Sequence, residues 1–278
     1  MTEAATYWGA KQGYAPNWYS FCARTINARI TGNPDLAPSM WALRHVLGAG
    51  PAKHLLEIGC LDGKKPANFK TAGLAIEASG VDYAEAAILR GQEQYGAEIS
   101  LSVMDLNEPA LPAQTFDIIL ANGVLHHIAN LEACVQNLYD ALMPGGALIA
   151  SDFTGPRRYA YSAREIALIN EGVAMLPEPM RVPFDPAVLA PKLAADPSES
   201  IRTRDIPDVI RATFDQVETI PYGGNVLMRA LPPKAIEGFD PENPEHVSAL
   251  EALSAFDHAV SSREPSHHHY VIARRAQK

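Results

Sequence analysis

The chain has 278 residues, of which 47% are hydrophobic and 20% charged, a composition typical of a globular protein with one large domain or one domain carrying an insert. Its net charge of −9 argues against a nucleic-acid backbone as the main partner, because phosphate binding needs clustered Lys and Arg. No basic leader and no apolar run of roughly 20 residues is present, and three cysteines without metal-like spacing predict reduced thiols, so we expect a cytoplasmic protein that does not enter a membrane.

The N-terminal part begins with an aromatic-rich stretch that includes Tyr7, Trp8 and Tyr14. The pattern predicts two helices, near residues 16–29 and 37–48, separated by a Gly-Asn-Pro turn. Aromatic side chains dominate core burial, so we expect most of them to pack these helices onto the rest of the protein. The alternative, that some of them line a binding site, stays open.

Residues 53–82 carry the pattern around which the chain is organised. A short apolar run stops at Gly59, as in a strand buried on both faces. Gly59 and Gly63 then bracket a tight turn, and Pro66 occupies what we expect to be a first helical position, where a missing N–H costs nothing. A second apolar run ends at Asp82. The stretch therefore predicts strand, glycine turn, helix and strand.

This arrangement suits a nucleoside. Glycines allow backbone N–H groups to approach a ligand closely, and a helix N-terminus adds a positive dipole. A carboxylate at the end of the next strand, here Asp82, can accept hydrogen bonds from both hydroxyls of a ribose. The residues thus predict a nucleoside-containing cofactor at the carboxyl end of a parallel sheet.

Helices and strands continue to alternate along the chain. We expect a helix, two strands, a helix and a strand at residues 84–95, 99–104, 116–122, 131–142 and 147–152. Asp105 ends the first of these strands, and a Pro-Gly-Gly turn precedes the last. Such alternation is typical of an α/β fold with a doubly wound, mostly parallel sheet.

The pattern changes after residue 153, where prolines become frequent around a predicted helix at 162–176. This insert is too long for a plain strand–helix connection, so we interpret it as a helical cap over the substrate, with a dimerisation surface as the alternative. A helix, strand, helix and strand follow at 203–214, 216–222, 244–261 and 270–273. The predicted parts are N-terminal helices, cofactor-binding core, cap insert and C-terminal part of the core sheet, at residues 1–50, 51–153, 154–202 and 203–278.

The glycine turn also carries a family resemblance. The stretch from Glu57 through Gly59 and Leu61 to Gly63 resembles the first motif of class I S-adenosylmethionine (SAM) methyltransferases, although Leu61 stands where that motif usually has glycine. The resemblance, which extends through the Pro-Gly-Gly turn, implies a Rossmann-like methyltransferase fold of seven strands, with the last strand antiparallel between the fifth and sixth. It also implies SAM as cofactor and a small polar acceptor, methylated at oxygen, such as a sugar, a glycan precursor or a natural product.

The resemblance places Asp82 on the ribose and Asp105 on the adenine amino group. The predicted cofactor-binding residues are Glu57, Gly59, Cys60, Leu61, Gly63, Asp82, Tyr83, Asp105, Leu106, Asn122 and Gly123. An oxygen acceptor often needs a proton removed, and histidine titrates close to neutrality. The predicted catalytic residues are therefore His126 and His127, with packing and hydrogen bonding as their alternative role.

Candidate substrate-binding residues come from other strand ends and from the insert: Tyr14, Asp152, Arg157, Arg158, Tyr159 and Tyr222. The two arginines, with others in or just after the insert (Arg181, Arg202 and Arg204), hint at an anionic small molecule because guanidinium groups clamp carboxylates and phosphates. A homodimer is left open.

The triplet His267-His268-His269 is the obvious metal candidate in the sequence. Adjacent strand residues point to opposite faces, so at most two of these rings share a side, and no nearby Cys or acid completes a ligand set. We therefore expect no metal site there.

Two further readings compete with a methyltransferase. An NAD(P)-dependent oxidoreductase shares the glycine turn and the acid, but Leu61 and Lys64 fill positions that its G-x-G-x-x-G pattern needs. A catalytically impaired relative, serving as a binding protein, would explain Leu61. Fold alone does not identify the acceptor.

Overall fold

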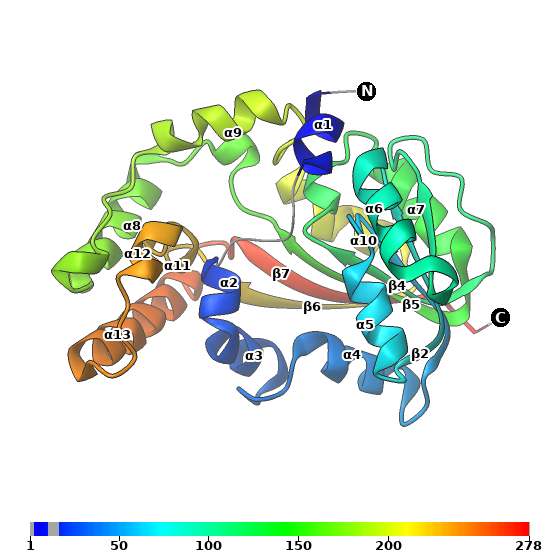
Figure 1. Cartoon of the computed structure of the whole chain (residues 1–278). Helices are drawn as coiled ribbons and strands as arrows, with labels where there is room; N and C mark the ends of the chain where they lie inside the picture. The colour runs from blue at the N-terminus through cyan, green and yellow to red at the C-terminus, as the bar shows by residue number, and fades with distance from the viewer. Residues whose placement is uncertain (1–2, 11–16, 278) are drawn as a thin grey trace.

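The computed structural model describes residues 3–10 and 17–277. Its centre is a seven-stranded sheet with the order β3-β2-β1-β4-β5-β7-β6 (Figure 1). The strands are β1 (Ala52–Ile58), β2 (Ala75–Asp82), β3 (Ser100–Val103), β4 (Phe116–Asn122), β5 (Leu142–Phe153), β6 (Gln216–Gly223) and β7 (His268–Arg274). Strands β1 to β5 pair in parallel, and β7 lies antiparallel between β5 and β6. The predicted doubly wound sheet and the inserted last strand are confirmed.

The helices cover both faces of this sheet and extend beyond it. They are α1 (Glu3–Gly9), α2 (Trp18–Phe21), α3 (Ala23–Thr31), α4 (Pro38–Leu47), α5 (Lys64–Thr71), α6 (Glu85–Tyr95), α7 (Leu131–Ala141), α8 (Ala163–Met175), α9 (Ala190–Ala195), α10 (Ile206–Thr213), α11 (Leu227–Ala230), α12 (Pro233–Glu237) and α13 (Pro244–Ser261).

Neighbouring residues on the central strands enter opposite cores, as a pleated strand requires. Leu55 packs in the core that includes α3, α4 and α5, whereas Leu56 packs in the core that includes α7 and α10. Ile118 and Ile119 on β4 divide in the same way, and all four side chains are almost fully buried. Burial on both faces explains the continuous apolar runs of these strands.

The insert joins a helical layer away from the core helices. Figure 1 shows α8 with α11, α12 and α13 on one side of the molecule, opposite α5, α6 and α7. The capping box of Ser162 and Glu165 begins α8, whose buried side packs on α11 and α13. At its other end the insert brings α9 against α1. The insert therefore contacts both the N-terminal helix α1 and the helices α11 and α13.

Some local predictions differ from the structure. Pro66 is the third residue of α5 rather than the first, a position whose N–H still lacks an intrahelical partner. The helix expected at 16–29 divides into α2 and α3, with Cys22 between them. Residues 144–146, expected as a turn, belong to β5. None of the helices in the described ranges is long and apolar enough to span a bilayer.

Candidate active site

A cavity of about 400 Å³ opens where β1, β2 and β4 end. This is the edge at which open α/β sheets bind ligands, and the volume falls within the roughly 300–1,000 Å³ of small-molecule sites. Its lining residues are Trp8, Gly59, Leu61, Asp82, Tyr83, Met104, Asp105, Leu106, Asn107, Asn122, Gly123, Val124, His127, Ile128, Pro197 and Ser198. Most come from strand ends, but Pro197 and Ser198 come from the insert and Trp8 from α1.

The glycine turn after β1 shapes one wall of this cavity. Gly59 has φ +66°, and a Cβ there would lie 2.6 Å from Val124 Cγ2, so only glycine fits. The N–H groups of Gly59 and Cys60 donate to Val81 O, and that of Gly63 donates to Cys60 O. These amides therefore donate to backbone carbonyl groups of the protein, whereas we expected them to be free to approach a ligand. The glycine at position 59 instead allows the turn to pack closely against Val124.

Leu61 adopts the left-handed backbone conformation that glycine usually supplies, with φ +50°. Its N–H donates a 2.9 Å hydrogen bond to Asp82 Oδ2, and its side chain lines the cavity without closing it. The departure from the family motif thus leaves the shape of the turn intact.

Asp82 is the buried carboxylate of the cavity, only 4% exposed. Its Oδ1 accepts from Ala84 N at 2.9 Å, while Oδ2 accepts from Leu61 N. Burial raises the pKa of this carboxyl, and the backbone donors oppose that shift. Because each carboxylate oxygen can accept a second hydrogen bond, Asp82 can still receive the two hydroxyls of a ribose.

Asp105 lies farther along the same wall, just after β3, and is exposed. Its Oδ1 accepts hydrogen bonds from the backbone N and the Nδ2 of Asn107, at 2.9 and 3.0 Å. Asp105 therefore caps a turn and also lines the cavity beside Leu106.

Three predicted cofactor residues lie behind the wall rather than in it. Glu57 is buried, pairs with Lys65 Nζ at 3.4 Å and accepts from Asn122 Nδ2 at 3.4 Å. Cys60 packs in a small core between β2 and α5, where burial raises the pKa of its thiol. Gly63 begins α5 with φ +76°. These residues support the turn, whereas Gly59, Leu61, Asp82, Tyr83, Asp105, Leu106, Asn122 and Gly123 line the cavity.

The histidine pair follows β4 on a single 3₁₀ turn, Leu125–His127. His126 is buried, with Nδ1 2.5 Å from Asp152 Oδ1 and Nε2 3.4 Å from Glu199 Oε1. Burial alone lowers the pKa of His126, but the two carboxylates outweigh it and raise the pKa to about 10. A ring that is already protonated at neutral pH cannot serve as the expected general base.

His127 differs from its neighbour because its ring lines the cavity. Its Nδ1 lies 3.0 Å from Ser198 Oγ and 3.3 Å from Asp196 Oδ2, and its Nε2 lies 3.9 Å from Glu199 Oε2. Burial and then the charge of His126 lower the pKa of His127 to about 4. The ring is therefore neutral at pH 7 and only weakly basic.

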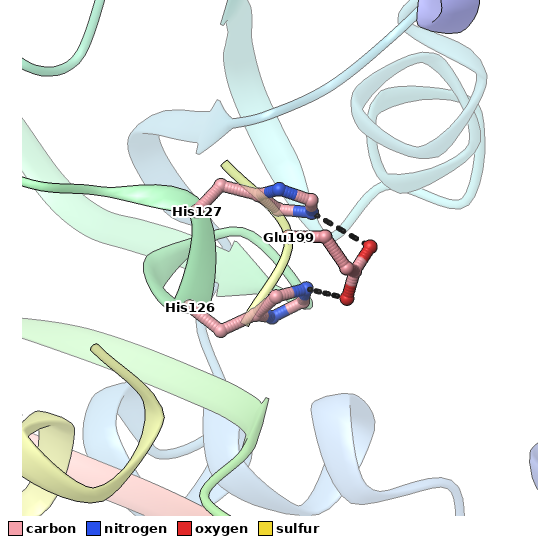
Figure 2. A group of neighbouring side chains, drawn as sticks. All are labelled: His126, His127 and Glu199. Carbon is pink, nitrogen blue, oxygen red and sulfur yellow. Dashed lines mark ion pairs between the residues drawn. The ribbon is translucent and has the colours of Figure 1, made fainter. Parts of the chain in front are cut away.

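Glu199 is the residue that sequence reasoning missed. Its fully buried carboxylate faces both histidine rings (Figure 2). It also accepts from Tyr159 and Ser200 hydroxyls, at 2.6 and 2.9 Å, and pairs with Lys192 Nζ at 2.8 Å. The only signal in the sequence is its place in the proline-rich insert, which does not distinguish it from other acids.

The predicted substrate residues lie outside the cavity lining, apart from Tyr14, which falls outside the described residues. Asp152 accepts from the backbone of Val124 and Leu125 and so holds the histidine turn in place. Tyr159 binds Glu199, and Tyr222 OH lies 3.0 Å from Ser151 Oγ.

The predicted arginine clamp is engaged in internal contacts. Arg157 pairs with Asp205, and Arg158 donates to backbone carbonyls of the insert, including Pro197 O at 2.8 Å. Arg202 pairs with Glu132 and Asp205, and Arg181 donates to Leu176 O. Arg157 and Arg202 join the insert to neighbouring elements, whereas Arg158 and Arg181 make contacts within the insert. The structure therefore provides no support for an anionic acceptor.

The His267-His268-His269 triplet contacts three different partners. His267 Nε2 lies 3.1 Å from Glu165 Oε1, His268 Nδ1 lies 3.2 Å from Gly223 O, and His269 Nδ1 lies 2.6 Å from Thr154 Oγ1. Their separate hydrogen bonds are those of residues that fasten β7 to its neighbours.

Comparison with known proteins shows similarity to methyltransferases in part of the chain. Residues 56–148 match a family model described as a methyltransferase domain. The 27-O-demethylrifamycin SV methyltransferase of Amycolatopsis mediterranei is 26% identical over 158 residues, covering 53% of this chain and 58% of that protein. An uncharacterized methyltransferase of Mycobacterium tuberculosis is 29% identical over 103 residues, covering 37% and 51%. The chain thus spans little more than half the length of the curated relatives it matches.

Among solved structures, phosphoethanolamine N-methyltransferase 2 of Haemonchus contortus in complex with SAM matches with a TM-score of 0.55 and 14% identity. The match covers 95% of this chain and 61% of that one, and at this identity it shows a shared fold. Residues 56–148 are therefore similar to a methyltransferase domain, and the sheet order together with the shared fold shows a Rossmann-like methyltransferase fold.

Proposed function

We propose that this chain transfers a methyl group from SAM to an oxygen atom of a small polar acceptor. The observation that carries the proposal is that the glycine turn, Asp82 and Asp105 line one cavity together with His127 and residues of the insert. The printed name of the Amycolatopsis relative describes methylation of a small molecule at oxygen, which supports the same acceptor class here.

The residues present fit the cofactor. Asp82 would hold the ribose hydroxyls, Asp105 and Leu106 would hold the adenine, and the turn at Gly59 would admit the amino-acid part. Tyr83 adds a further observation, because its buried hydroxyl has no hydrogen-bond partner among the described residues although the side chain lines the cavity. An unsatisfied buried hydroxyl is costly, and a bound polar ligand would satisfy it.

When bound, SAM supplies a methyl group on a positively charged sulfur, and its C–S bond breaks as the new C–O bond forms. The protein then has to align the acceptor oxygen and exclude water. Trp8, Pro197 and Ser198, which come from α1 and the insert, also line the cavity and would limit the entry of water. His127 is the catalytic candidate on this wall, acting by orienting the acceptor, because its pKa of about 4 makes it a poor proton acceptor.

Calorimetry with SAM and with its demethylated product tests the cofactor assignment. We expect both to bind in the micromolar range, and Asp82→Asn to weaken binding by about ten- to a hundredfold because hydrogen bonds to a charged group are lost. Glu85→Gln, a change at an exposed carboxylate at the start of α6, is the matched control and should leave affinity unchanged. A folded protein that binds neither compound would refute the proposal.

Transfer of a radiolabelled methyl group from SAM to a panel of hydroxyl-bearing sugars and natural-product scaffolds tests the reaction. A labelled product whose new methyl resonance is that of an O-methyl group would support the acceptor class. Labelling at nitrogen or carbon would contradict it. Tight SAM binding without labelling of any acceptor in the panel would favour the catalytically impaired relative.

A further inference from the structure

We propose that His126, His127 and Glu199 form a binding site for a divalent transition-metal ion at the edge of the cofactor cavity. Zn²⁺ is the natural occupant, because two imidazoles and one carboxylate make up a known catalytic zinc set that leaves a coordination position open. The site itself stands on the geometry of this chain, whereas its use in binding an acceptor rests on the proposed function.

The three candidate ligands already converge. Nε2 of His126 lies 3.4 Å from Glu199 Oε1, Nε2 of His127 lies 3.9 Å from Glu199 Oε2, and one ligand atom from each residue falls within 4.8 Å of the others (Figure 2). Zinc–ligand bonds of about 2.0–2.2 Å at tetrahedral angles would separate such atoms by roughly 3.3 Å. The ligand atoms would therefore have to approach one another by at most about 1.5 Å to complete the set.

Each histidine is also held as a metal ligand is usually held. Nδ1 of His126 faces the Asp152 carboxylate at 2.5 Å, and Nδ1 of His127 faces Asp196 Oδ2 at 3.3 Å and Ser198 Oγ at 3.0 Å. Metal-bound histidines characteristically donate their other N–H to a carboxylate, which sets the tautomer and strengthens the ligand. Both rings here present Nε2 to the same carboxylate.

Glu199 provides the second, independent indication of a ligand. Its buried Oε2 accepts no hydrogen bond in the described part of the chain and is approached only by ion-pair partners, with Lys192 Nζ at 2.8 Å. Tyr159 and Ser200 donate to the other oxygen, Oε1, and so orient the carboxylate. Oε2 is therefore contacted by cationic groups, and a metal ion could take the place of Lys192.

Lys192 occupies the place of a competing cation. Its side chain is 36% exposed, whereas that of Glu199 is 0% exposed, so the ammonium group can swing into solvent when an ion binds. The wall at His127 and Ser198 faces the cavity, which gives the ion an entry path and an open position for an acceptor hydroxyl. Coordination of that hydroxyl would favour loss of its proton to water.

The competing explanation is a purely structural network in which protonated His126 and Lys192 balance the charge of Glu199. Two titrations of chelator-treated protein distinguish a metal site from such a network. Co²⁺ binding is monitored by visible absorption, and Zn²⁺ binding is measured by calorimetry. We expect one equivalent of Co²⁺ to produce the absorption bands of a low-coordinate site, and Zn²⁺ to displace it. Absence of these bands, with correctly folded protein, would overturn the proposal.

Variants make the assignment specific. Glu199→Gln and His127→Asn should each lower Zn²⁺ affinity by at least about a hundredfold, and Asp152→Asn by about ten- to a hundredfold through its hydrogen bond to His126. Lys192→Gln should raise affinity, because it removes the competing ammonium, whereas a structural network predicts no gain. His45→Asn is the matched control, since His45 pairs with Glu218 at an exposed surface site and should not affect binding.

Measurement without SAM keeps this proposal independent of the methyltransferase assignment. Metal binding with the variant pattern above supports the site even when no acceptor is methylated. SAM binding and methyl transfer in protein that binds no metal would confirm the proposed function and overturn the metal site. Circular dichroism and thermal melts of each variant establish that lost affinity is not lost folding.

Discussion

The backbone N–H of Leu61 donates a 2.9 Å hydrogen bond to Asp82 Oδ2, joining the turn after β1 to the end of β2. The two residues pack where parallel strands β1 and β2 end side by side. This bond places the carboxylate at the cavity and explains why the turn keeps its shape with leucine in a left-handed conformation. A backbone hydrogen bond, rather than the identity of the side chain at position 61, therefore holds this wall of the cavity together.

Substitutions at Leu61 test this relationship. Leu61→Val should lower the free energy of unfolding by about 1–2 kcal/mol, because a β-branched residue tolerates positive φ poorly. Leu61→Gly relieves the strain and should keep SAM affinity within a few-fold of the parent. Chemical denaturation measures the free energy of unfolding of both variants, and calorimetry measures their SAM affinity. Loss of SAM binding in the glycine variant would show that the leucine side chain itself contributes to the site.

Gly91 on α6 supports the same turn from behind. A Cβ at this position would lie 2.2 Å from Asp62 O, a backbone atom that cannot move without shifting the glycine turn. Gly91→Ala should therefore destabilise the protein by about 2 kcal/mol or more and weaken SAM binding. Gly50→Ala, where an added Cβ meets no atom within 4 Å, is the control and should be nearly neutral. Equal melting temperatures for the two variants would contradict this account.

The ion pair between Arg29 and Asp257 ties α3 to α13 inside the protein. Its atoms lie 2.6 Å apart, and Asp257 also accepts from the N–H groups of Gly224 and Val226. Asp257→Asn should cost about 3–5 kcal/mol, because it leaves the guanidinium group buried without its counter-charge. Urea denaturation provides the measurement.

A surface pair provides the matched control for that change. Arg24 and Asp35 are 72% and 67% exposed, so Asp35→Asn should change stability by less than about 0.5 kcal/mol. A similar loss in both variants would mean that burial is not the cause of the effect.

The lowered pKa of His269 on β7 leads us to expect that the stability of the protein depends on pH. Burial, and then the charge of Arg211, lower the pKa of His269 from 6.5 to about 4. Between these values the unfolded chain binds a proton that the folded protein does not, so stability decreases as the pH falls from about 6.5 toward 4. After allowance for partial exposure, the contribution between pH 7.5 and 5 is about 1–2 kcal/mol.

Replacing His269 isolates this contribution. His269→Gln removes the titrating ring and can still hydrogen-bond Thr154, so its stability should vary less with pH than that of the parent. Denaturant titrations at pH 7.5 and 5 make the comparison. Identical pH slopes would show that other groups, such as the buried His268, whose pKa is lowered mainly by burial, account for the whole effect.

Much of the fold is readable from local pattern. The apolar runs at residues 53–58 and 116–122 indicate strands buried on both faces, and glycine at 59 and 63 indicates the turn between strand and helix. These features depend on nearest neighbours in the chain, so the sheet and the cofactor wall with Asp82 and Asp105 could be predicted. Helix boundaries were less secure, because tertiary contacts decide where α2 ends and α3 begins.

The roles of the remaining polar residues were decided by the tertiary structure. Arg158 was expected at the substrate but instead holds the insert, and Asp152 anchors the histidine turn. Glu199 meets His126 and His127 only because the insert folds back over the end of β4. The sequence by itself determined the half of the cavity that we propose binds the cofactor, since that half is built from consecutive strand ends. The half that we propose faces the acceptor depends on which distant segments share a buried volume, and local periodicity carries no information about such pairings.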